Sequence, residues 1–173
     1  MEAPICIRPA RLADAGIISR IIERSVRVGC ALDHRNNSSI VSDWVSQSCV
    51  DFISRRLADP HFYLCVALFE EKPVGVGMAQ ACGDIPLCYV QPESFRRGVG
   101  RALMQDLEGW LRVRGVQSVH LNSTHTAKAF YRHLGYQQAA PTAISNGLQT
   151  VPLHKPLASP ALQLDQGCKS APR

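Results

Sequence analysis

Apolar residues recur along the chain with two different periods, and these periods predict where helices and strands lie. Apolar positions three and four residues apart predict helices at 12–28, 40–57 and 124–134, and another in the segment that ends at Gly115. Short runs rich in β-branched and aromatic residues predict strands. These runs occupy residues 4–9, 61–69, 74–81, 85–90, 116–121, 136–140 and 147–154.

The order of these elements predicts the fold class. A strand and two helices come first, three strands in hairpin-like succession follow, and then come a helix, a strand, a helix and two strands. This order is typical of an α/β or α+β domain with a mixed sheet. The length of 173 residues and the mass of 19.0 kDa fit one such domain. We expect it to span residues 1–156, and residues 157–173, which have no periodicity, to form a flexible tail.

The composition is that of a soluble globular protein, with 46% apolar and 19% charged residues. No apolar run approaches the roughly 20 residues that a membrane helix needs, so we expect no membrane partner. The seven cysteines are irregularly spaced and include no C-x-x-C pair. This spacing argues against a disulfide framework and against a metal site. Free cysteines suit a reducing compartment, so we expect a cytoplasmic protein.

The net charge of +5 comes from 19 Lys and Arg against 14 Asp and Glu. A modest net charge relates to solubility more than to a partner. A nucleic-acid-binding domain would carry a dense basic stripe and bind DNA in a steeply salt-dependent way. The main local cluster, Arg96, Arg97 and Arg101, fits a bound phosphate better than DNA. We therefore expect no nucleic-acid partner.

The segment LCYVQPESFRRGVGRALM, residues 87–104, carries the clearest chemical signal. A buried strand ends at Val90, and Gly98 and Gly100 stand where the next helix begins. A helix N-terminus offers unpaired N–H groups and a partial positive charge, and glycines let a ligand approach the backbone closely. The arginine cluster adds positive charge. The segment predicts a cradle for a diphosphate, and the alternative is a plain strand-to-helix turn with incidental arginines.

At these residues the chain resembles the GCN5-related N-acetyltransferase (GNAT) family, in particular its small bacterial members. The acetyl-CoA motif of the family, Q/R-x-x-G-x-G/A after a V-x-P strand end, is similar to residues 90–92 (VQP) and 98–100 (GVG). The second signature, F-Y-x-x-L-G-F/Y, is similar to residues 130–136 (FYRHLGY). The resemblance covers about residues 4–154. It implies a GNAT-like, mostly antiparallel central sheet of about seven strands, flanked by four helices.

The resemblance also implies an activity, the transfer of an acetyl group from acetyl-CoA to a primary amine of a small molecule or protein without a metal. The amine would attack the thioester directly in a ternary complex. A backbone N–H of Tyr89 or Val90 would stabilise the oxyanion, and Tyr131 would protonate the leaving thiolate. The matching positions imply further contacts to acetyl-CoA from Arg96, Arg97, Gly98, Val99, Gly100, Arg101, Thr124, Ala127 and Phe130.

The attacking amine has to lose a proton, because an alkyl ammonium group with a pKa near about 10.4 stays charged at neutral pH. One candidate base is Asp84, near the start of the predicted strand 85–90. The other is His34, in the loop after the first helix, where the family builds its acceptor pocket. The alternatives are that His34 is a solvated loop residue and that water carries the proton.

One position departs from the family pattern. Phe95 stands where the family has Gln or Arg, a side chain that helps to hold the pyrophosphate. Either Arg96 or Arg97 takes over this contact, or the affinity for the cofactor is weaker. The departure keeps a second function open, a non-catalytic acyl-CoA-binding or sensing module. The acceptor amine and the choice between a monomer and a homodimer stay open as well.

Overall fold

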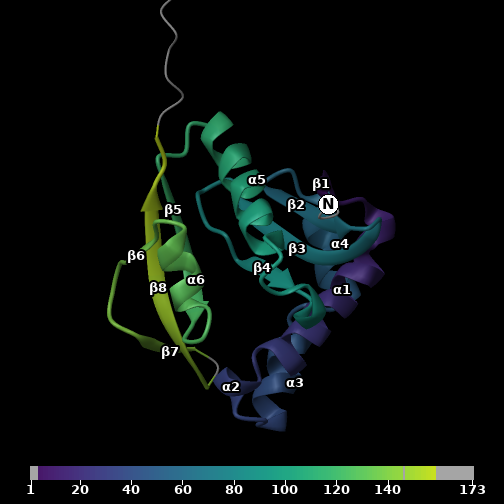
Figure 1. Ribbon diagram of the computed structural model, residues 1–173, viewed down its shortest axis with the longest axis vertical. Helices are drawn as coiled ribbons and strands as arrows, with labels where there is room; N and C mark the ends of the chain where they lie inside the picture. Colours follow the sequence, from purple (N-terminus) through teal and green to yellow (C-terminus); the bar gives the residue numbers. More distant parts are fainter. Residues whose placement is uncertain (1–3, 146, 159–173) are drawn as a thin grey trace, which may run out of the picture.

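Two four-stranded sheets and the helices around them make up the fold in the computed structural model, which describes residues 4–145 and 147–158 (Figure 1). The first sheet has the order β1-β2-β3-β4, and its neighbouring strands all pair antiparallel. Its strands are β1 (Ile5–Pro9), β2 (Phe62–Phe69), β3 (Lys72–Gln80) and β4 (Leu87–Val90).

The second sheet is built on one long strand, β8, which pairs antiparallel with each of its partners. Its strands are β5 (Ser118–Thr124), β6 (Gln137–Gln138), β7 (Ala143–Ser145) and β8 (Leu148–Pro156). The two sheets meet at a parallel bridge between Asp84 and His120, where the Ile85 N–H donates to the His120 carbonyl at 2.9 Å. Beyond this bridge β4 and β5 do not pair, so a gap opens between the sheets.

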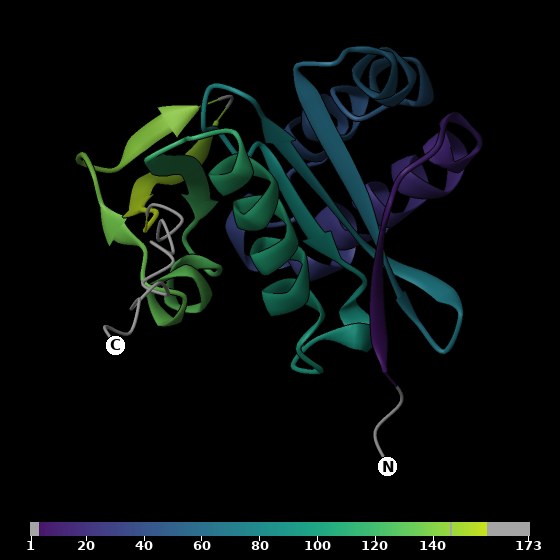
Figure 2. The same ribbon diagram turned by 90° about the horizontal axis from the view of Figure 1, so that it is seen from above.

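The helices cover both faces of the first sheet. Helices α1 and α4 pack on one face, and α5 packs on the other, between the two sheets (Figure 2). The short helices α2 and α3 lie near the β7–β8 end of the second sheet (Figure 1). The helices are α1 (Ala15–Arg24), α2 (Ala31–His34), α3 (Ser38–Ser46), α4 (Val50–Ala58), α5 (Val99–Val113) and α6 (Lys128–His133).

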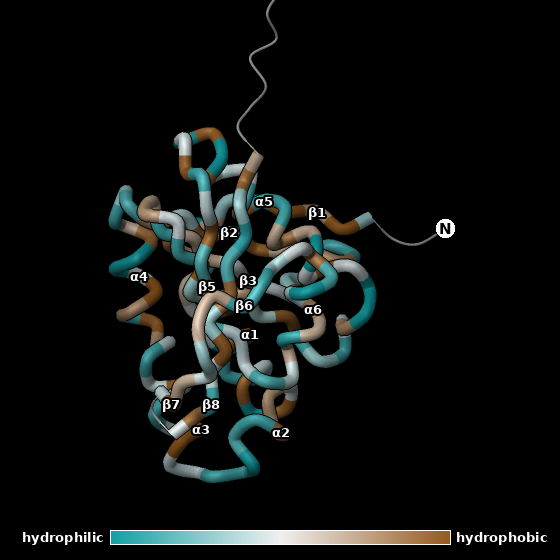
Figure 3. The backbone as a smooth tube through the Cα atoms, turned by 90° about the vertical axis from the view of Figure 1, so that its left-hand side faces the viewer, coloured by the Kyte–Doolittle hydropathy of each residue, from teal (hydrophilic) through white to brown (hydrophobic). Residues whose placement is uncertain are grey.

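Helix α5 supplies the centre of the core, because its apolar stripe faces both sheets. The side chains of Leu103, Leu107 and Leu111 are fully buried. Gly77 of β3 lets the helix approach the strand closely, since an added Cβ would lie 2.8 Å from Leu107 Cδ1. The alternation of hydrophobic and hydrophilic colours along α4 in Figure 3 shows the same principle, with Ile53 fully buried on the inner side of that helix.

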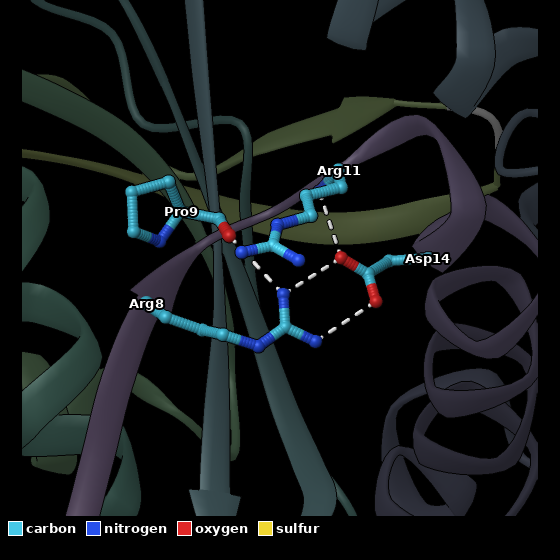
Figure 4. A network of polar contacts seen from close by, with 4 residues as sticks. All are labelled: Arg8, Pro9, Arg11 and Asp14. Carbon is cyan, nitrogen blue, oxygen red and sulfur yellow. Dashed lines mark hydrogen bonds and ion pairs between the residues drawn. The ribbon is translucent and has the colours of Figure 1, made fainter.

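An Arg–Asp pair ties β1 to the turn that precedes α1 (Figure 4). Arg8 Nη1 and Nη2 donate to the two carboxylate oxygens of Asp14 at 2.7 and 2.9 Å, and the Arg11 N–H donates to Asp14 Oδ2 at 2.7 Å. The hydrogen bonds from Arg8 lower the pKa of Asp14 to about 2. This bidentate geometry fixes the direction in which the chain enters α1.

The predicted class, an α+β fold with mostly antiparallel strands, is confirmed, but several details differ from the expectation, among them six α-helices in the described residues in place of the four expected. The strands form two sheets rather than one. The predicted helix 40–57 is interrupted, because Gln47 ends α3 and Cys49 adopts an extended conformation before α4. The predicted strand 85–90 begins at Leu87, since Pro86 has no N–H for the ladder and Ile85 bonds to the second sheet instead.

Packing reaches slightly beyond the expected domain boundary at residue 156. The side chain of Leu157 is 6% exposed, and its N–H donates to the Gln117 carbonyl at 2.8 Å. Most of the expected tail, residues 159–173, lies outside the described residues. Within the described part, none of the helices has the length and apolar character needed to cross a membrane.

Candidate active site

A cavity of about 930 Å³ fills the gap where β4 and β5 separate. One side, which we call the α5 wall, is formed by the loop before α5, the first turn of α5, and the segment that enters α6. The opposite side, which we call the α3 wall, is formed by the turn after α1, by α3, and by the β7–β8 hairpin. Eleven of the fourteen predicted site residues line the cavity: Tyr89, Val90, Arg96, Gly98, Val99, Gly100, Arg101, Thr124, Ala127, Phe130 and Tyr131.

The N-terminus of α5 has the geometry of an anion cradle. Gly98 caps the helix with a φ of 83°, and Arg96 two residues earlier also has a left-handed φ of 59°. Gly100 lies under the ring of Phe130, so that an added Cβ would lie 3.0 Å from Phe130 Cζ. The first N–H groups of a helix have no intrahelical partner, and here the residues that carry them line the cavity together with Arg101.

Arg97 lies away from this cradle. Its guanidinium stacks over the ring of Phe69 at 5.2 Å from the ring centre, and it is not among the cavity-lining residues. Arg96 and Arg97 are both candidates to replace the missing phosphate contact, and of the two only Arg96 lines the cavity. Phe95 itself also lines the cavity and leans toward Gly29 of the opposite wall, where an added Cβ would lie 2.9 Å from Phe95 Cζ.

Strand β4 lies between the two sides of the cavity, and its successive side chains point to opposite sides. Cys88 and Val90 pack with the α5 side of the core, and Tyr89 packs with the α1 and α3 side. The Gln91 N–H donates to the Val74 carbonyl at 2.8 Å. Because hydrogen-bonding direction alternates along a strand, the Tyr89 N–H also points toward β3, and the Val90 N–H points toward the gap. Of the two predicted oxyanion donors, Val90 has the suitable orientation.

Tyr131 of α6 lies in the cavity wall between two aromatic neighbours. Its ring makes edge-to-face contacts with Phe130 and Tyr136, at centroid distances of 5.0 and 5.7 Å. The side chain is 8% exposed, and burial raises the pKa of its hydroxyl well above the usual range. The hydroxyl is thus protonated at neutral pH and can donate a proton. Burial also raises the pKa of the neighbouring Cys88 thiol, to about 12.

His34 is placed differently from the expectation. It is 2% exposed and does not line the cavity. Its Nε2 lies 3.0 Å from the Val26 carbonyl oxygen, and its Nδ1 accepts from the Asn36 N–H at 3.1 Å. Both ring nitrogens are used by the backbone, so the side chain fixes the turn after α1. This geometry argues against its predicted role as a base.

Asp84 also lies outside the cavity. It forms the bridge to His120 where the two sheets meet, and its side chain is exposed. Its carboxylate accepts a weak hydrogen bond from the Cys82 thiol at 3.4 Å. Asp84 lies where the two sheets are joined, whereas Tyr131 lines the cavity that opens where they separate. A substrate would lie in that cavity, so this position argues against Asp84 as a base.

The resemblance places an acceptor pocket beside the first helices, but apart from Tyr89 of β4 the residues of the α3 wall were not among the predicted site residues. The Trp44 indole N–H donates to the Tyr89 hydroxyl at 2.8 Å, which ties α3 to β4 across this wall. In the sequence, Trp44 is distinguished only by its place in the apolar helical pattern of residues 40–57. Core residues follow the same pattern, so the pattern does not identify a cavity residue. The unpredicted cavity residues on this side come from three segments: Ser25, Gly29, Cys30, Ile40, Trp44, Gln47, Ser145, Leu148 and Thr150.

The fold corresponds to that of a known family. A family model described as the acetyltransferase (GNAT) domain matches residues 31–157, which is more than half of the chain. The chain belongs to the GNAT acetyltransferase family. The resemblance seen in the sequence is thereby confirmed, and the cavity lies between the two motifs that carried it.

Solved structures share the GNAT fold over nearly the whole described chain. A GCN5-related N-acetyltransferase from Rhodopseudomonas palustris has a TM-score of 0.80 at 23% identity, covering 91% of this chain and 98% of that one. The PaiA N-acetyltransferase from Thermoplasma acidophilum, in complex with coenzyme A, has a TM-score of 0.75 at 12% identity, covering 89% and 99%. At these identities the likeness shows the fold alone.

Sequence similarity to curated GNAT relatives is more local. The N-alpha-acetyltransferase 80 of Mus musculus is 36% identical over an alignment of 94 positions that covers 46% of this chain and 30% of that protein. The chain spans less than two thirds of the length of the curated relatives it matches. Across residues 4–145 and 147–158 of this GNAT chain, no group of three or more His, Cys, Asp or Glu is arranged to hold a metal ion.

Proposed function

We propose that this GNAT protein transfers the acetyl group of acetyl-CoA to a primary amine of a small molecule or protein by direct attack. The observation that carries the proposal is the combination of an open helix N-terminus and a protonated tyrosine in one cavity. The cradle at Gly98–Arg101 suits a diphosphate, and Tyr131 suits a leaving thiolate. Coenzyme A contains both groups, joined by a pantetheine arm that has to pass between β4 and β5.

Each residue has one task in this proposal. The N–H groups at the start of α5 and the Arg96 and Arg101 guanidinium groups bind the phosphates. The Val90 N–H, which points into the gap, donates to the oxygen of the thioester carbonyl as charge develops on it. The Tyr131 hydroxyl donates its proton to the sulfur as the carbon–sulfur bond breaks. The amine loses its ammonium proton to water before it attacks, and its second proton goes to the Tyr131 oxygen after the sulfur has been protonated, because the predicted bases His34 and Asp84 do not line the cavity.

A second candidate function is an acyl-CoA-binding module without catalysis. Phe95 favours it, because the family places Gln or Arg there and this ring packs toward Gly29. Retention of Tyr131 with a protonated hydroxyl favours the enzyme. The two functions differ in turnover, since a binding module holds acetyl-CoA but releases no coenzyme A in the presence of amines.

The experiment is a calorimetric titration of the protein with acetyl-CoA, followed by a screen of amines for acetylated product. We expect binding in the micromolar range at about one acetyl-CoA per chain. Acetylated product from any amine supports the enzyme, and binding without product across the whole panel supports the module. Absence of binding up to millimolar acetyl-CoA would contradict both functions.

A further inference from the structure

If the α5 wall holds acetyl-CoA as proposed above, the acceptor has to bind against the α3 wall. Strand β4 divides the cavity, with Val90 facing α5 and the Tyr89 side chain facing α1 and α3. The chemistry of the α3 wall therefore reports on the acceptor. This inference rests on the proposed function for the position of the acceptor and goes beyond it in naming the acceptor's class.

Among the residues that the structure describes, those of the α3 wall carry no acidic side chain. Of the described residues that line the cavity, none is Asp or Glu. The α3 wall itself is neutral, with apolar and aromatic surface from Ile40, Trp44, Tyr89 and Leu148 and polar atoms from Gln47 and Ser145. An ammonium group that leaves water needs a carboxylate or several acceptors in return. This wall supplies no carboxylate, and its side-chain acceptors are neutral: Ser25, Gln47, Ser145 and Thr150.

Two carboxylates next to cavity-lining residues already have partners in the chain. Asp33 accepts hydrogen bonds from the backbone N–H and the hydroxyl of Thr126. Glu93 pairs with Arg24 on the outer surface. Neither lines the cavity. Glu93 is neutralised by Arg24, whereas Asp33 keeps its charge and adds to the effect of burial in raising the pKa of the lining Cys30 thiol, without contributing an atom to the wall.

The titratable groups in the cavity add no negative charge at neutral pH. Burial raises the pKa of Cys30 and of Cys88 to about 12 each, and it raises the pKa of Tyr89 and of Tyr131 as well. These groups stay protonated, so the wall remains neutral through the physiological range. The charged and titratable lining residues that remain, Arg96, Arg101 and His133, lie on the α5 and α6 side, and the two arginines repel a cation.

We propose that the acceptor is an aromatic primary amine, whose nitrogen is uncharged at neutral pH and whose ring packs against Trp44 and Tyr89. Such an amine needs no base before attack, which agrees with the positions of His34 and Asp84 outside the cavity. Its nitrogen forms a bond to the thioester carbon, and the carbon–sulfur bond breaks. The sulfur takes the Tyr131 proton, and the proton lost by nitrogen restores Tyr131, so the products are an N-acetylated aromatic amine and free coenzyme A.

The test compares two amines of similar size with the same substituents, the planar 4-methoxyaniline, which is neutral at pH 7, and the saturated 4-methoxycyclohexylamine, which is charged. Binding of each to the protein saturated with coenzyme A is measured by calorimetry, because binding does not depend on the intrinsic reactivity of the amine. We expect 4-methoxyaniline to bind at least about tenfold more tightly. Tighter binding of the charged amine, or no binding of 4-methoxyaniline up to millimolar concentration, would overturn the proposal.

A charge placed in the α3 wall sharpens this test. Gln47 lines the cavity and is exposed, so Gln47→Glu adds one negative charge without disturbing the core. We expect this variant to bind 4-methoxycyclohexylamine about tenfold more tightly than the wild type does and 4-methoxyaniline with little change. The matched control is Gln105→Glu, an exposed position of α5 that does not line the cavity, and it should change neither affinity.

The outcomes separate this inference from the proposed function. Preferred binding of 4-methoxyaniline without any acetylated product would contradict the enzyme and keep the aromatic ligand class. Acetylated product from the charged amine, together with its tighter binding, would keep the enzyme and overturn the aromatic acceptor. An unchanged affinity of Gln47→Glu for the charged amine would show that the α3 wall does not contact the amine, which also overturns the inference.

Discussion

The two walls of the cavity are built by different means. The α5 wall presents backbone N–H groups, which glycines at positions 98 and 100 keep accessible, and a rim of arginines. The α3 wall presents side chains, neutral and partly aromatic, from segments that lie far apart in the sequence. A backbone cradle recognises a constant group such as a diphosphate, and a side-chain wall can be changed residue by residue. With the cofactor on the α5 wall and the acceptor on the α3 wall, as proposed above, a substitution in one wall can alter one binding partner without altering the other.

The largest effect is expected where the α5 wall is filled. In Gly100→Val, the added side chain has to displace the Phe130 ring, because the Cβ alone would lie 3.0 Å from Phe130 Cζ. We expect the affinity for acetyl-CoA to fall at least about 100-fold, or about 2.7 kcal/mol, in a calorimetric titration. Gly109→Val on the same helix is the control, since no atom lies within 4 Å of its added Cβ. Equal affinities for the two variants would refute the backbone cradle.

The second prediction concerns the support behind the α3 wall. His34→Ala leaves the buried Val26 carbonyl and the Asn36 N–H without their side-chain partner, so we expect the free energy of unfolding to fall by about 2 kcal/mol. Denaturant unfolding measures this loss. The pH dependence of the rate should match that of the wild type, because His34 moves no proton in the reaction. His34→Gln, which keeps a donor for Val26, gives a second protein for the pH profile. A lost acidic limb in either variant would restore His34 as a base.

The sequence could predict the α5 wall because its chemistry is local. Gly98, Gly100 and Tyr131 each belong to a short motif whose spacing follows from one helix, and the structure brings these motifs to one cavity. The α3 wall depends on long-range packing, such as the bond between Trp44 and Tyr89, and a helical period cannot distinguish a core residue from a cavity residue. The same limit explains His34, whose sequence neighbours suggest a solvated loop and whose ring is buried. It also explains the interrupted helix 40–57, where the apolar period continues across the break.

The third prediction tests the residue that lies between the walls. Tyr131→Phe removes the proton donor and keeps the edge-to-face contacts with Phe130 and Tyr136. We expect kcat to fall at least about tenfold, equivalent to about 1.4 kcal/mol of activation free energy, with nearly unchanged affinity for acetyl-CoA. Because burial raises the pKa of this hydroxyl, loss of the proton donor should not limit the wild-type rate near neutral pH. An unchanged kcat in the variant would mean that water protonates the thiolate.

The smallest effect is expected at Phe95, where the α5 wall approaches Gly29 of the α3 wall. Phe95 is 46% exposed, so Phe95→Arg adds a charge near the phosphate cradle without opening the core. We expect the affinity for acetyl-CoA to rise about threefold at low salt, or about 0.6 kcal/mol, which is the size of an exposed ion pair. The gain should disappear at high ionic strength, because salt screens exposed charges. Val113→Arg, at the far end of α5 and 83% exposed in the wild type, controls for net charge. A gain in both variants would mean that net charge attracts the cofactor, and a gain in neither would mean that Arg96 and the backbone already satisfy the diphosphate.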